Sequence, residues 1–267
     1  MIEVKNLVKR YGDHTAVDHL SFEIEKGKIY GFLGPNGAGK STTMNMITGY
    51  IASTEGTVVI DGHDILEEPE EAKKCIGYLP EMPPLYFDMT VLEYLKFVAD
   101  LKKIPKDKKA TMIEEIMDMV KITDMKNRLI KNLSKGYRQR VGIAQAVLGY
   151  PEVIILDEPT AGQDFKHYTE IMEFLRKLNE RGVTVVMITH DMHLMLEYTP
   201  RALVFSDGQL IADRRASEVL CDPELIERAA LKETSLFTLA NHCAITPPEA
   251  FVERFIGEDR EVRSHGC

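Results

Sequence analysis

Residues 29–48 read IYGFLGPNGAGKSTTMNMIT, and this stretch decides the fold. The apolar run 29–33 predicts a short buried strand, and the glycine-rich residues after it predict a tight turn. Methionine and isoleucine side chains give residues 41–47 the apolar face of a helix. The turn matches G-x-x-x-x-G-K-[ST], the spacing of a phosphate-binding loop, and stands between a strand and a helix as that loop requires.

The residue types of this loop suit the binding of phosphate. Glycines allow backbone N–H groups to turn inward around a phosphate, and the start of the following helix adds positive potential. Lys40 is predicted to reach the β- and γ-phosphates, and the Ser41 hydroxyl is predicted to ligate Mg²⁺. The loop therefore predicts a nucleoside triphosphate as substrate, with Mg²⁺ as cofactor.

A second apolar run, residues 153–156, ends in two carboxylates, Asp157 and Glu158. A buried parallel strand would bring both to its C-terminal edge, where ligands bind in open α/β sheets. Asp157 is predicted to hold Mg²⁺, directly or through water, and Glu158 to orient and deprotonate an attacking water. An ordinary solvated strand end would also suit both residues, so it is their pairing with residues 39–41 that indicates hydrolysis.

The composition is that of an ordinary globular protein with an acidic balance. Of the 267 residues, 44% are hydrophobic and 28% are charged. Lys and Arg number 33 against 42 Asp and Glu, which leaves a net charge of −9. Because nucleic-acid binding needs basic patches, this balance argues against a nucleic-acid partner.

We expect neither a membrane span nor a signal peptide in this chain. Its longest apolar runs, such as residues 183–188, are far short of the roughly 20 residues that a spanning helix needs. The first residues lack the charged-then-apolar pattern of a signal peptide. The cysteines form no C-x-x-C pair, so we expect reduced thiols in a cytoplasmic protein at Cys75, Cys221, Cys243 and Cys267.

A helical insert is predicted between two α/β halves, at about residues 90–148. It begins with Thr90-x-x-Glu93, which has the spacing of a capping box. Apolar stripes at helical spacing follow, first after Thr90 and again from about residue 112. Methionines in this insert are expected to fill gaps in its core.

The α/β pattern returns after the insert. Residues 153–156 and 183–188 are predicted to be parallel strands buried on both faces, with a crossover helix between them. A hairpin is predicted around residues 206–208. Beyond about residue 216 the chain is predicted to be helical, with the polar residues 258–267 fraying.

Residues 133–140 read LSKGYRQR, which resembles the signature motif LSGGQ of the ATP-binding cassette (ABC) ATPases. The resemblance covers roughly residues 1–215, with six motifs in that family's order and spacing. It places Tyr11 at the position of the aromatic residue that stacks on adenine, and His190 at that of the switch histidine. Asp164 falls in the loop that contacts a second subunit, known as the D-loop. The implied activity is ATP hydrolysis.

The resemblance also implies a fold and a division of the chain. The fold is α/β: a P-loop NTPase cassette with a mixed or parallel sheet core, an antiparallel β subdomain and a helical signature subdomain at about residues 85–148. Residues 1–215 would form this ATPase domain, and residues 216–267 a helical accessory segment. The apolar faces of that segment could pack on its own domain or on a second ATPase subunit, and both possibilities stay open.

Head-to-tail dimers of the family imply that each ATP is shared between two chains. Ser134 would begin a helix whose N-terminus faces the γ-phosphate held by the other subunit. His190 would hydrogen-bond the γ-phosphate and stabilise charge in the transition state. A second ABC ATPase subunit, identical or different, is therefore an expected partner.

The expected site residues fall into groups by role. The catalytic residues are Lys40, Glu158 and His190. The ATP-binding residues are Tyr11, Gly34, Pro35, Asn36, Gly37, Ala38, Gly39, Lys40, Ser41 and Thr42. The signature residues, which would act on the partner's ATP, are Ser134, Lys135, Gly136 and Tyr137. The D-loop residue is Asp164, and the ligands of Mg²⁺ are Ser41, Asp157 and Glu81.

Two of these residues have another possible role. Tyr11 could be part of the core, although its place before a glycine turn favours stacking. His190 and His193 have the His-x-x-His spacing of a metal pair, but no matching set of carboxylates and histidines is evident.

The chain departs from the family pattern at three positions. Glu81 stands where the family usually has glutamine; a carboxylate can still ligate Mg²⁺, but it adds negative charge beside Asp157 and Glu158. Lys135 replaces the first glycine of the signature, and Tyr137 replaces its glutamine.

Two subfamily patterns meet in the chain. Up to about residue 160 the motifs resemble ATPases of drug and sodium efflux. Residues 161–164, 189–195 and 232–236 resemble ATPases of energy-coupling factor importers of vitamins and metals. The sequence leaves open whether this mosaic is natural or an artificial join, and hence the direction of transport.

The leading hypothesis is an ATP-hydrolysing subunit that drives transport through a separate integral membrane subunit, at the cytoplasmic face of the cell membrane. The apolar loop 82–87 lies where the family grips its membrane partner, although it could also be buried against its own domain. The alternative is a soluble ABC ATPase that acts on ribosomes or DNA. One cassette, the absence of heptads and the charge of −9 argue against it.

Overall fold

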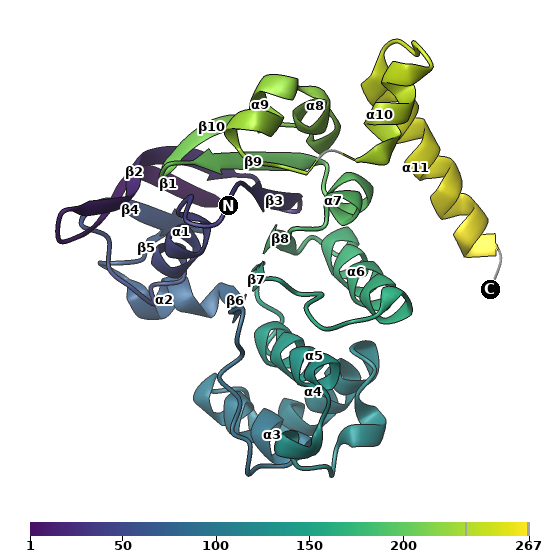
Figure 1. Cartoon of the computed structure of the whole chain (residues 1–267). Coiled ribbons are helices and arrows are strands. Elements are labelled where there is room, and N and C mark those ends of the chain that lie inside the picture. The colour runs from purple at the N-terminus through teal and green to yellow at the C-terminus, as the bar shows by residue number, and fades with distance from the viewer. Residues whose placement is uncertain (233, 266–267) are drawn as a thin grey trace.

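The computed structural model describes residues 1–232 and 234–265, without the side chains of residues 165, 166, 261 and 263–265. Two sheets and a separate group of helices make up its main body, with a helical hairpin at the C-terminal end (Figure 1). Cys267 and Glu233, which entered the expectations above, lie outside the described residues.

The first sheet is antiparallel and has the strand order β2-β1-β4-β5. Apolar and polar residues alternate along it, so that Ile2 and Val4 are buried while Glu3 and Lys5 turn outward or to the edge. This confirms the predicted antiparallel β subdomain. Its strands are β1 (Ile2–Tyr11), β2 (His14–Ile24), β4 (Glu55–Ile60) and β5 (His63–Asp64).

The second sheet carries the predicted parallel strands and has the order β10-β9-β3-β8-β7-β6 within the described residues. Neighbouring strands from β9 to β6 are parallel, and β10 is antiparallel to β9. Every residue of β3, β7 and β8 is buried, as expected for strands covered on both faces. The strands are β3 (Ile29–Leu33), β6 (Ile76–Leu79), β7 (Val153–Asp157), β8 (Thr184–Ile188), β9 (Arg201–Ser206) and β10 (Gln209–Arg214).

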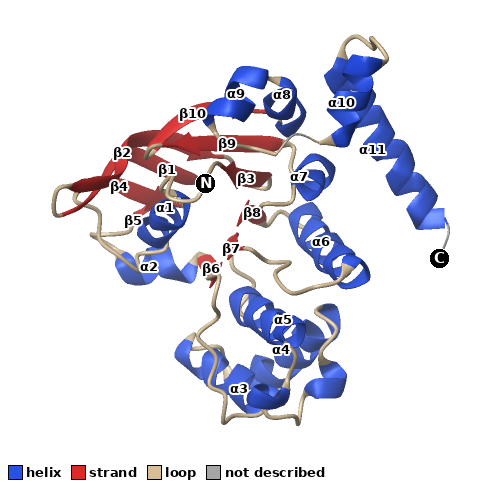
Figure 2. Ribbon diagram, in the orientation of Figure 1, coloured by secondary structure: helices blue, strands red, loops and turns tan. Residues whose placement is uncertain are grey.

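The core has two layers, one on each face of the mixed sheet. One joins the antiparallel sheet to α1 (Lys40–Ile47), whose Met44, Met46 and Ile47 are buried. The other lies under α5 (Lys135–Val147), α6 (Phe165–Glu180) and α7 (Met192–Tyr198). Figure 2 shows α6 and α7 beside the strands of this sheet and α5 between the sheet and the rest of the helical insert. A short helix, α2 (Pro69–Lys74), precedes β6.

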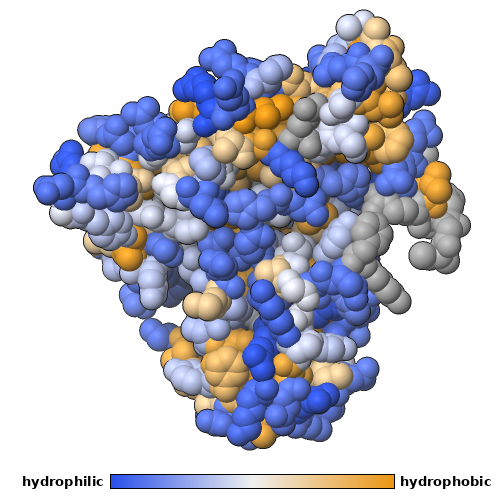
Figure 3. Space-filling view, viewed as in Figure 1, coloured by the Kyte–Doolittle hydropathy of each residue, from blue (hydrophilic) through white to orange (hydrophobic). Residues whose placement is uncertain are grey.

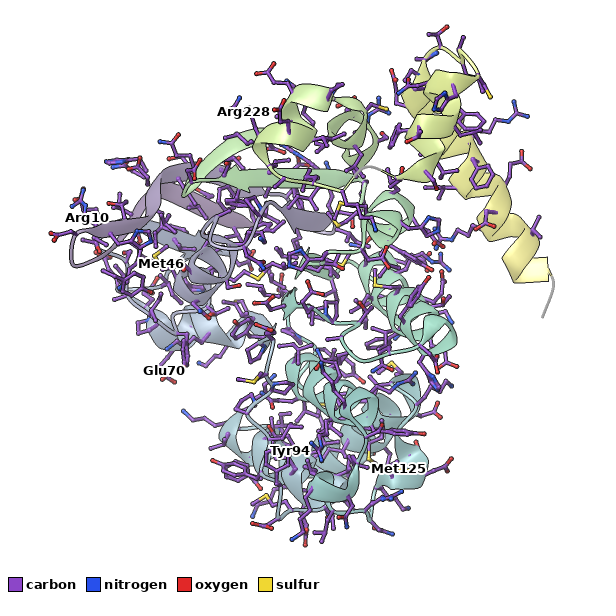
Figure 4. All side chains as sticks on the ribbon, in the orientation of Figure 1. Arg10, Met46, Glu70, Tyr94, Met125 and Arg228 are labelled. Carbon is purple, nitrogen blue, oxygen red and sulfur yellow. The ribbon has the colours of Figure 1, made fainter. Side chains whose placement is uncertain are left out.

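The helical insert forms as predicted from α3 (Val91–Leu101), α4 (Lys106–Met119), two short 3₁₀ turns (Thr123–Met125 and Ile130–Asn132) and α5. Its capping box is present: the Thr90 hydroxyl accepts from the Glu93 N–H at 3.3 Å, and the Thr90 N–H donates to Glu93 at 2.8 Å. The side chain of Tyr94, labelled in Figure 4, is buried inside the insert and donates to Gln145 of α5. The insert therefore has its own small core.

Within the described residues, four helices follow β10: α8 (Ala216–Cys221), α9 (Pro223–Arg228), α10 (Ser235–His242) and α11 (Pro248–His265). The expected fraying after residue 258 is wrong as far as His265, because α11 continues to that residue. Arg260 holds this part of the helix in place; its guanidinium donates to Glu173 at 2.9 Å and lies over the Tyr198 ring. None of the described helices is both long and apolar enough to cross a membrane.

Candidate nucleotide-binding site

The predicted phosphate-binding loop lies between β3 and α1, and its backbone requires glycine. Gly34 has a φ of 137° and Gly39 a φ of 92°, values that side chains rarely allow. A Cβ on Gly34 would lie 2.1 Å from the Phe205 carbonyl oxygen, and one on Gly39 would lie 2.6 Å from the Ala16 carbonyl oxygen. The loop is thus pressed against β9 and β2, which explains why the motif needs glycines at both ends.

Lys40 begins α1 and is 6% exposed. Its Nζ donates to the carbonyl oxygens of Gly34 at 2.7 Å and Pro35 at 2.8 Å, so it closes the loop on itself. Burial lowers the pKa of Lys40, and the nearby carboxylates of Asp157 and Glu158 partly offset that effect. A cation is therefore held at the loop, where an anionic ligand would gain most from it.

A cavity of about 640 Å³ opens beside the loop. It gathers eleven of the predicted residues from separate elements: Tyr11, Asn36, Gly37, Gly39, Lys40, Ser41, Thr42, Glu81, Asp157, Glu158 and His190. Three lining residues were not predicted: His14, Ala16 and Ile188. Gly34, Pro35 and Ala38 belong to the loop without lining the cavity. Its volume is in the range of pockets that hold small ligands and cofactors.

The two carboxylates at the end of β7 lie in different environments. Burial raises the pKa of Asp157; the Glu81 charge adds to this effect, and the Ser41 hydroxyl hydrogen bond opposes it. Burial, and then the charge of Asp157, raises the pKa of Glu158 to about 7. A carboxyl group that titrates near neutral pH is suited to accept a proton from water.

The carboxylate of Glu158 has few partners. Among the described residues, no group hydrogen-bonds its Oε1, although Nε2 of His190 lies 3.6 Å away. The backbone N–H of His190 donates to the carboxylate and lowers its pKa somewhat. Strands β7 and β8 are neighbours, so the sheet order brings Glu158 and His190 together.

His190 and His193 do not form a metal pair with a third ligand. His193 is the second residue of α7, and its Nε2 lies 3.7 Å from Glu197. In the part of the chain that the structure describes, no three His, Cys, Asp or Glu side chains form a metal-binding group. His190 is more than half exposed at the cavity, which leaves it accessible to a phosphate.

Tyr11 lies at the end of β1, paired across the hairpin with His14. Its side chain is 51% exposed and lines the cavity, so it is not a core residue. The Lys9 ammonium group lies 5.2 Å from the ring centroid and covers one face. A ligand base could therefore stack on the other face. His14 was missed because no motif in the sequence points to it; its pairing with Tyr11 across the hairpin brings it to the cavity.

The signature residues lie away from the cavity of their own chain. Ser134 caps α5, and its hydroxyl accepts from the Tyr137 N–H at 3.4 Å. Asp164 caps α6 by accepting from the His167 N–H at 2.9 Å. Ser134, Lys135 and Asp164 are exposed. The N-terminus of α5 therefore faces solvent in the single chain.

The raised pKa of Glu158 also predicts how the stability of the nucleotide-free protein depends on pH. The folded state keeps this proton up to about pH 7, whereas an unfolded glutamate releases it near pH 4.5. Between these values the folded state binds more protons, so its stability falls as pH rises. We expect the free energy of unfolding to drop by about 1–3 kcal/mol through this group. Urea unfolding at about pH 5 and about pH 8 measures the drop.

The variant Glu158→Gln should remove that contribution. Its stability should exceed that of the wild type most clearly at the higher pH. Glu227→Gln, on the exposed face of α9, is the control and should leave the pH dependence unchanged. An identical pH slope in wild type and Glu158→Gln would show that Glu158 does not titrate in this window.

Comparison with protein families matches residues 17–161 to the family described as ABC transporter. Among curated proteins, an Enterococcus faecalis protein named as an ABC transporter ATP-binding protein is 44% identical over 256 residues, 95% of this chain and 45% of that protein. One from Clostridium perfringens is 40% identical over 271 residues, 99% of this chain and 47% of that protein. The chain spans about half the length of these relatives.

Solved structures agree with this match. An ATP-binding cassette in a dimeric post-hydrolysis state bound to ADP and Pi has a TM-score of 0.74 and 30% identity, over 81% of this chain and 99% of that one. CbiO1 of Clostridium perfringens, part of the ABC transporter complex cbiONQ, has a TM-score of 0.75 and 28% identity, over 91% of this chain and 98% of that one.

Proposed function

The chain belongs to the ATP-binding proteins of the ABC transporter family, and we propose that it hydrolyses ATP with Mg²⁺ to drive transport through a separate membrane subunit. The observation that carries the proposal is the cavity in which Lys40, Asp157 and Glu158 meet. The Lys40 ammonium group lies near the two carboxylates there, and the carboxyl group of Glu158 has its pKa raised to about 7. The simplest test is phosphate release from ATP by the purified chain, with and without Mg²⁺.

Each of the proposed site residues has a separate role in the hydrolysis. The loop N–H groups, the start of α1 and Lys40 hold the β- and γ-phosphates. Glu158 accepts a proton from the attacking water while the water oxygen bonds to the γ-phosphorus. The bond between the γ-phosphorus and the β–γ bridging oxygen breaks, which releases ADP. His190, exposed beside Glu158, donates a hydrogen bond to the γ-phosphate oxygens.

Mg²⁺ fits the hard oxygen atoms at this end of the cavity. The Ser41 hydroxyl donates a hydrogen bond to the Asp157 carboxylate. The charge of Glu81 lies close enough to raise the pKa of Asp157. Together with phosphate oxygens, these three residues would hold the ion, which usually keeps few protein ligands. When bound, the ion neutralises charge on the transferring phosphoryl group.

Exchanging Glu81 for glutamine is expected to have a small effect. An amide oxygen can replace a carboxylate oxygen near Mg²⁺, and one negative charge beside Asp157 is lost. We expect a modest shift of the Mg²⁺ or pH optimum of ATPase activity. A rise in turnover of more than about ten-fold, or about 1.4 kcal/mol of barrier, would instead show that Glu81 impairs the wild-type enzyme.

A second ATPase subunit would complete each site. The exposed start of α5, capped by Ser134, offers an anion-binding helix end that its own cavity does not use. Lys135, Gly136 and Tyr137 would then lie against the partner's ATP, and Asp164 would lie at the contact between the subunits. The dimeric cassette structure supports this arrangement.

A membrane subunit is proposed to bind the loop after β6. Met82 is 84% exposed and Phe87 48%, while Leu85 is buried and anchors the loop. Figure 3 shows hydrophobic atoms exposed over the helical insert, to which this loop leads. A peripheral place at the cytoplasmic face of the membrane follows from this proposal. Co-purification with a membrane protein, lost on Met82→Asp but not on Lys96→Ala, would support it.

We propose that the accessory part of the C-terminal segment is its last two helices. Val219 and Leu220 of α8 are completely buried in the main core. Helices α10 and α11 pair with each other as a hairpin, α11 packs against α7 and α8, and Phe237, Val252 and Ile256 add to the edge of the same core. A chain ending at Leu231 should bind ATP within about three-fold of the full chain, because the hairpin is remote from the cavity. Folded protein that loses ATP binding would contradict this.

A further inference from the structure

Two glutamine side chains tie the signature segment to the loop that carries Glu158. Nε2 of Gln139, on α5, donates to the Glu158 carbonyl oxygen at 2.9 Å. In the other direction, Nε2 of Gln163 donates to the Gly136 carbonyl oxygen at 2.8 Å. Figure 1 shows the loop from β7 to α6 passing beside α5. Neither glutamine was among the predicted site residues.

The two segments also pack tightly. A Cβ on Gly136 would lie 3.0 Å from Oε1 of Gln163, and one on Gly162 would lie 2.8 Å from the Lys135 side chain. Gly162 has a φ of 73°, which favours glycine. A shift of the signature residues 134–137 would therefore displace the loop that begins at Glu158.

The backbone of Glu158 is held in an unfavourable conformation. Its φ is 51°, in the left-handed region, and the next residue is Pro159, which further restricts the residue before it. A residue in such a conformation keeps it only where the surrounding structure enforces it. The hydrogen bonds and packing around Glu158 must therefore hold its backbone in this left-handed conformation.

Among the described residues, three hydrogen bonds hold the backbone of Glu158. The Glu158 N–H donates to the Ile188 carbonyl oxygen at 3.1 Å, and its own carbonyl oxygen accepts from the Ala161 N–H at 3.1 Å and from Gln139. Of these three, the bond from Gln139 is the one made by a side chain. That side chain is 3% exposed, so water does not compete for the carbonyl.

We propose that Gln139 is a positioning residue for Glu158, and that it joins the signature helix to the general base of the same chain. The backbone N–H of His190 bonds the Glu158 carboxylate, and no described group hydrogen-bonds its Oε1, so the backbone of Glu158 itself contributes strongly to where the carboxylate points. Gln139 fixes that backbone from α5, whose N-terminus carries Ser134. The inference rests on the proposed ATPase function.

The variant Gln139→Met keeps the side-chain length and removes the amide. We expect kcat to fall by about 10–100-fold, the usual cost of a misplaced catalytic group. The ATP KM should change by less than about three-fold, because ATP binding does not involve this bond. Gln139→Leu also removes the donor and adds no charge, and it should behave alike, which covers the case in which the methionine variant fails to fold.

Gln145→Met is the matched control. Gln145 lies on the same helix but bonds Tyr94 inside the helical insert. It should lose stability without a comparable fall in kcat. An equal fall in both variants, or a matching rise in the ATP KM of Gln139→Met, would overturn the proposal in favour of a purely structural role.

Two further readouts separate this inference from the ATPase proposal. In the Glu158→Gln background, Gln139→Met should reduce residual turnover by less than about two-fold, because both changes act through one group. Without nucleotide, the Ala161 amide, which shares the Glu158 carbonyl, should exchange its hydrogen faster in Gln139→Met. Additive losses or unchanged exchange would overturn the inference. A wild-type chain without turnover would instead overturn the ATPase proposal.

Discussion

Replacing Lys40 with alanine is expected to reduce ATP turnover by at least about 100-fold, which corresponds to about 2.7 kcal/mol of barrier. The Lys40 ammonium is the cation that the fold holds at the phosphate loop, 2.7 Å from the Gly34 carbonyl oxygen. Its removal leaves the β- and γ-phosphates facing Asp157 and Glu158 without that compensating charge. Steady-state phosphate release and ATP binding by calorimetry measure the two effects.

The control for this variant is Lys96→Ala, which removes an exposed lysine from α3. It loses the same formal charge at a distance from the cavity, so turnover should stay within about two-fold. Wild-type ATP affinity and turnover in Lys40→Ala would show that residues 34–42 are not the phosphate site.

Glu158→Gln is expected to bind ATP and hydrolyse it about 10²–10⁴ times more slowly. The amide keeps the shape of the side chain but cannot accept the proton that the attacking water must lose. Bound ATP would then persist between two chains, so the variant should elute as a dimer in size-exclusion runs with Mg²⁺ and ATP. Without ATP it should elute as the wild type does.

Glu152→Gln is the matched control for Glu158, the proposed general base. Glu152 precedes the same strand, but it is an exposed partner of Lys26 on the surface. Its turnover should remain near that of the wild type. If Glu158→Gln turned over normally and stayed monomeric with ATP, another group would have to serve as the base.

The raised pKa of Glu158 could not have been predicted from the sequence. The motif places Asp157 and Glu158 at a strand end, and a solvated strand end would leave both with ordinary titration. Burial in the folded chain, together with the charge of the adjacent aspartate, moves the glutamate to about 7. The desolvation comes from residues distant in sequence, so no local pattern records it.

The expected fraying of the last residues failed for a similar reason. Polar residues after 258 suggested a free end, but Arg260 donates to Glu173 of α6 and stacks on Tyr198 of α7. A polar residue that pairs across the fold looks the same in the sequence as one that faces water. Only the position of α11 against α6 and α7 distinguishes the two.

The sequence by itself determined the glycine-rich turn between β3 and α1, the capping box at Thr90 and the buried parallel strands. Each of these depends on a short stretch of chain, because glycine conformations, helix caps and apolar periodicity act over a few residues. The tertiary structure alone decided which of those stretches meet. The strand order β3-β8-β7-β6 brings Glu81, Glu158 and His190 into one cavity, and the packing of α5 places Gln139 against the Glu158 carbonyl. Such contacts join residues far apart in the chain, and they form only when the apolar strands have paired in this order in the sheet.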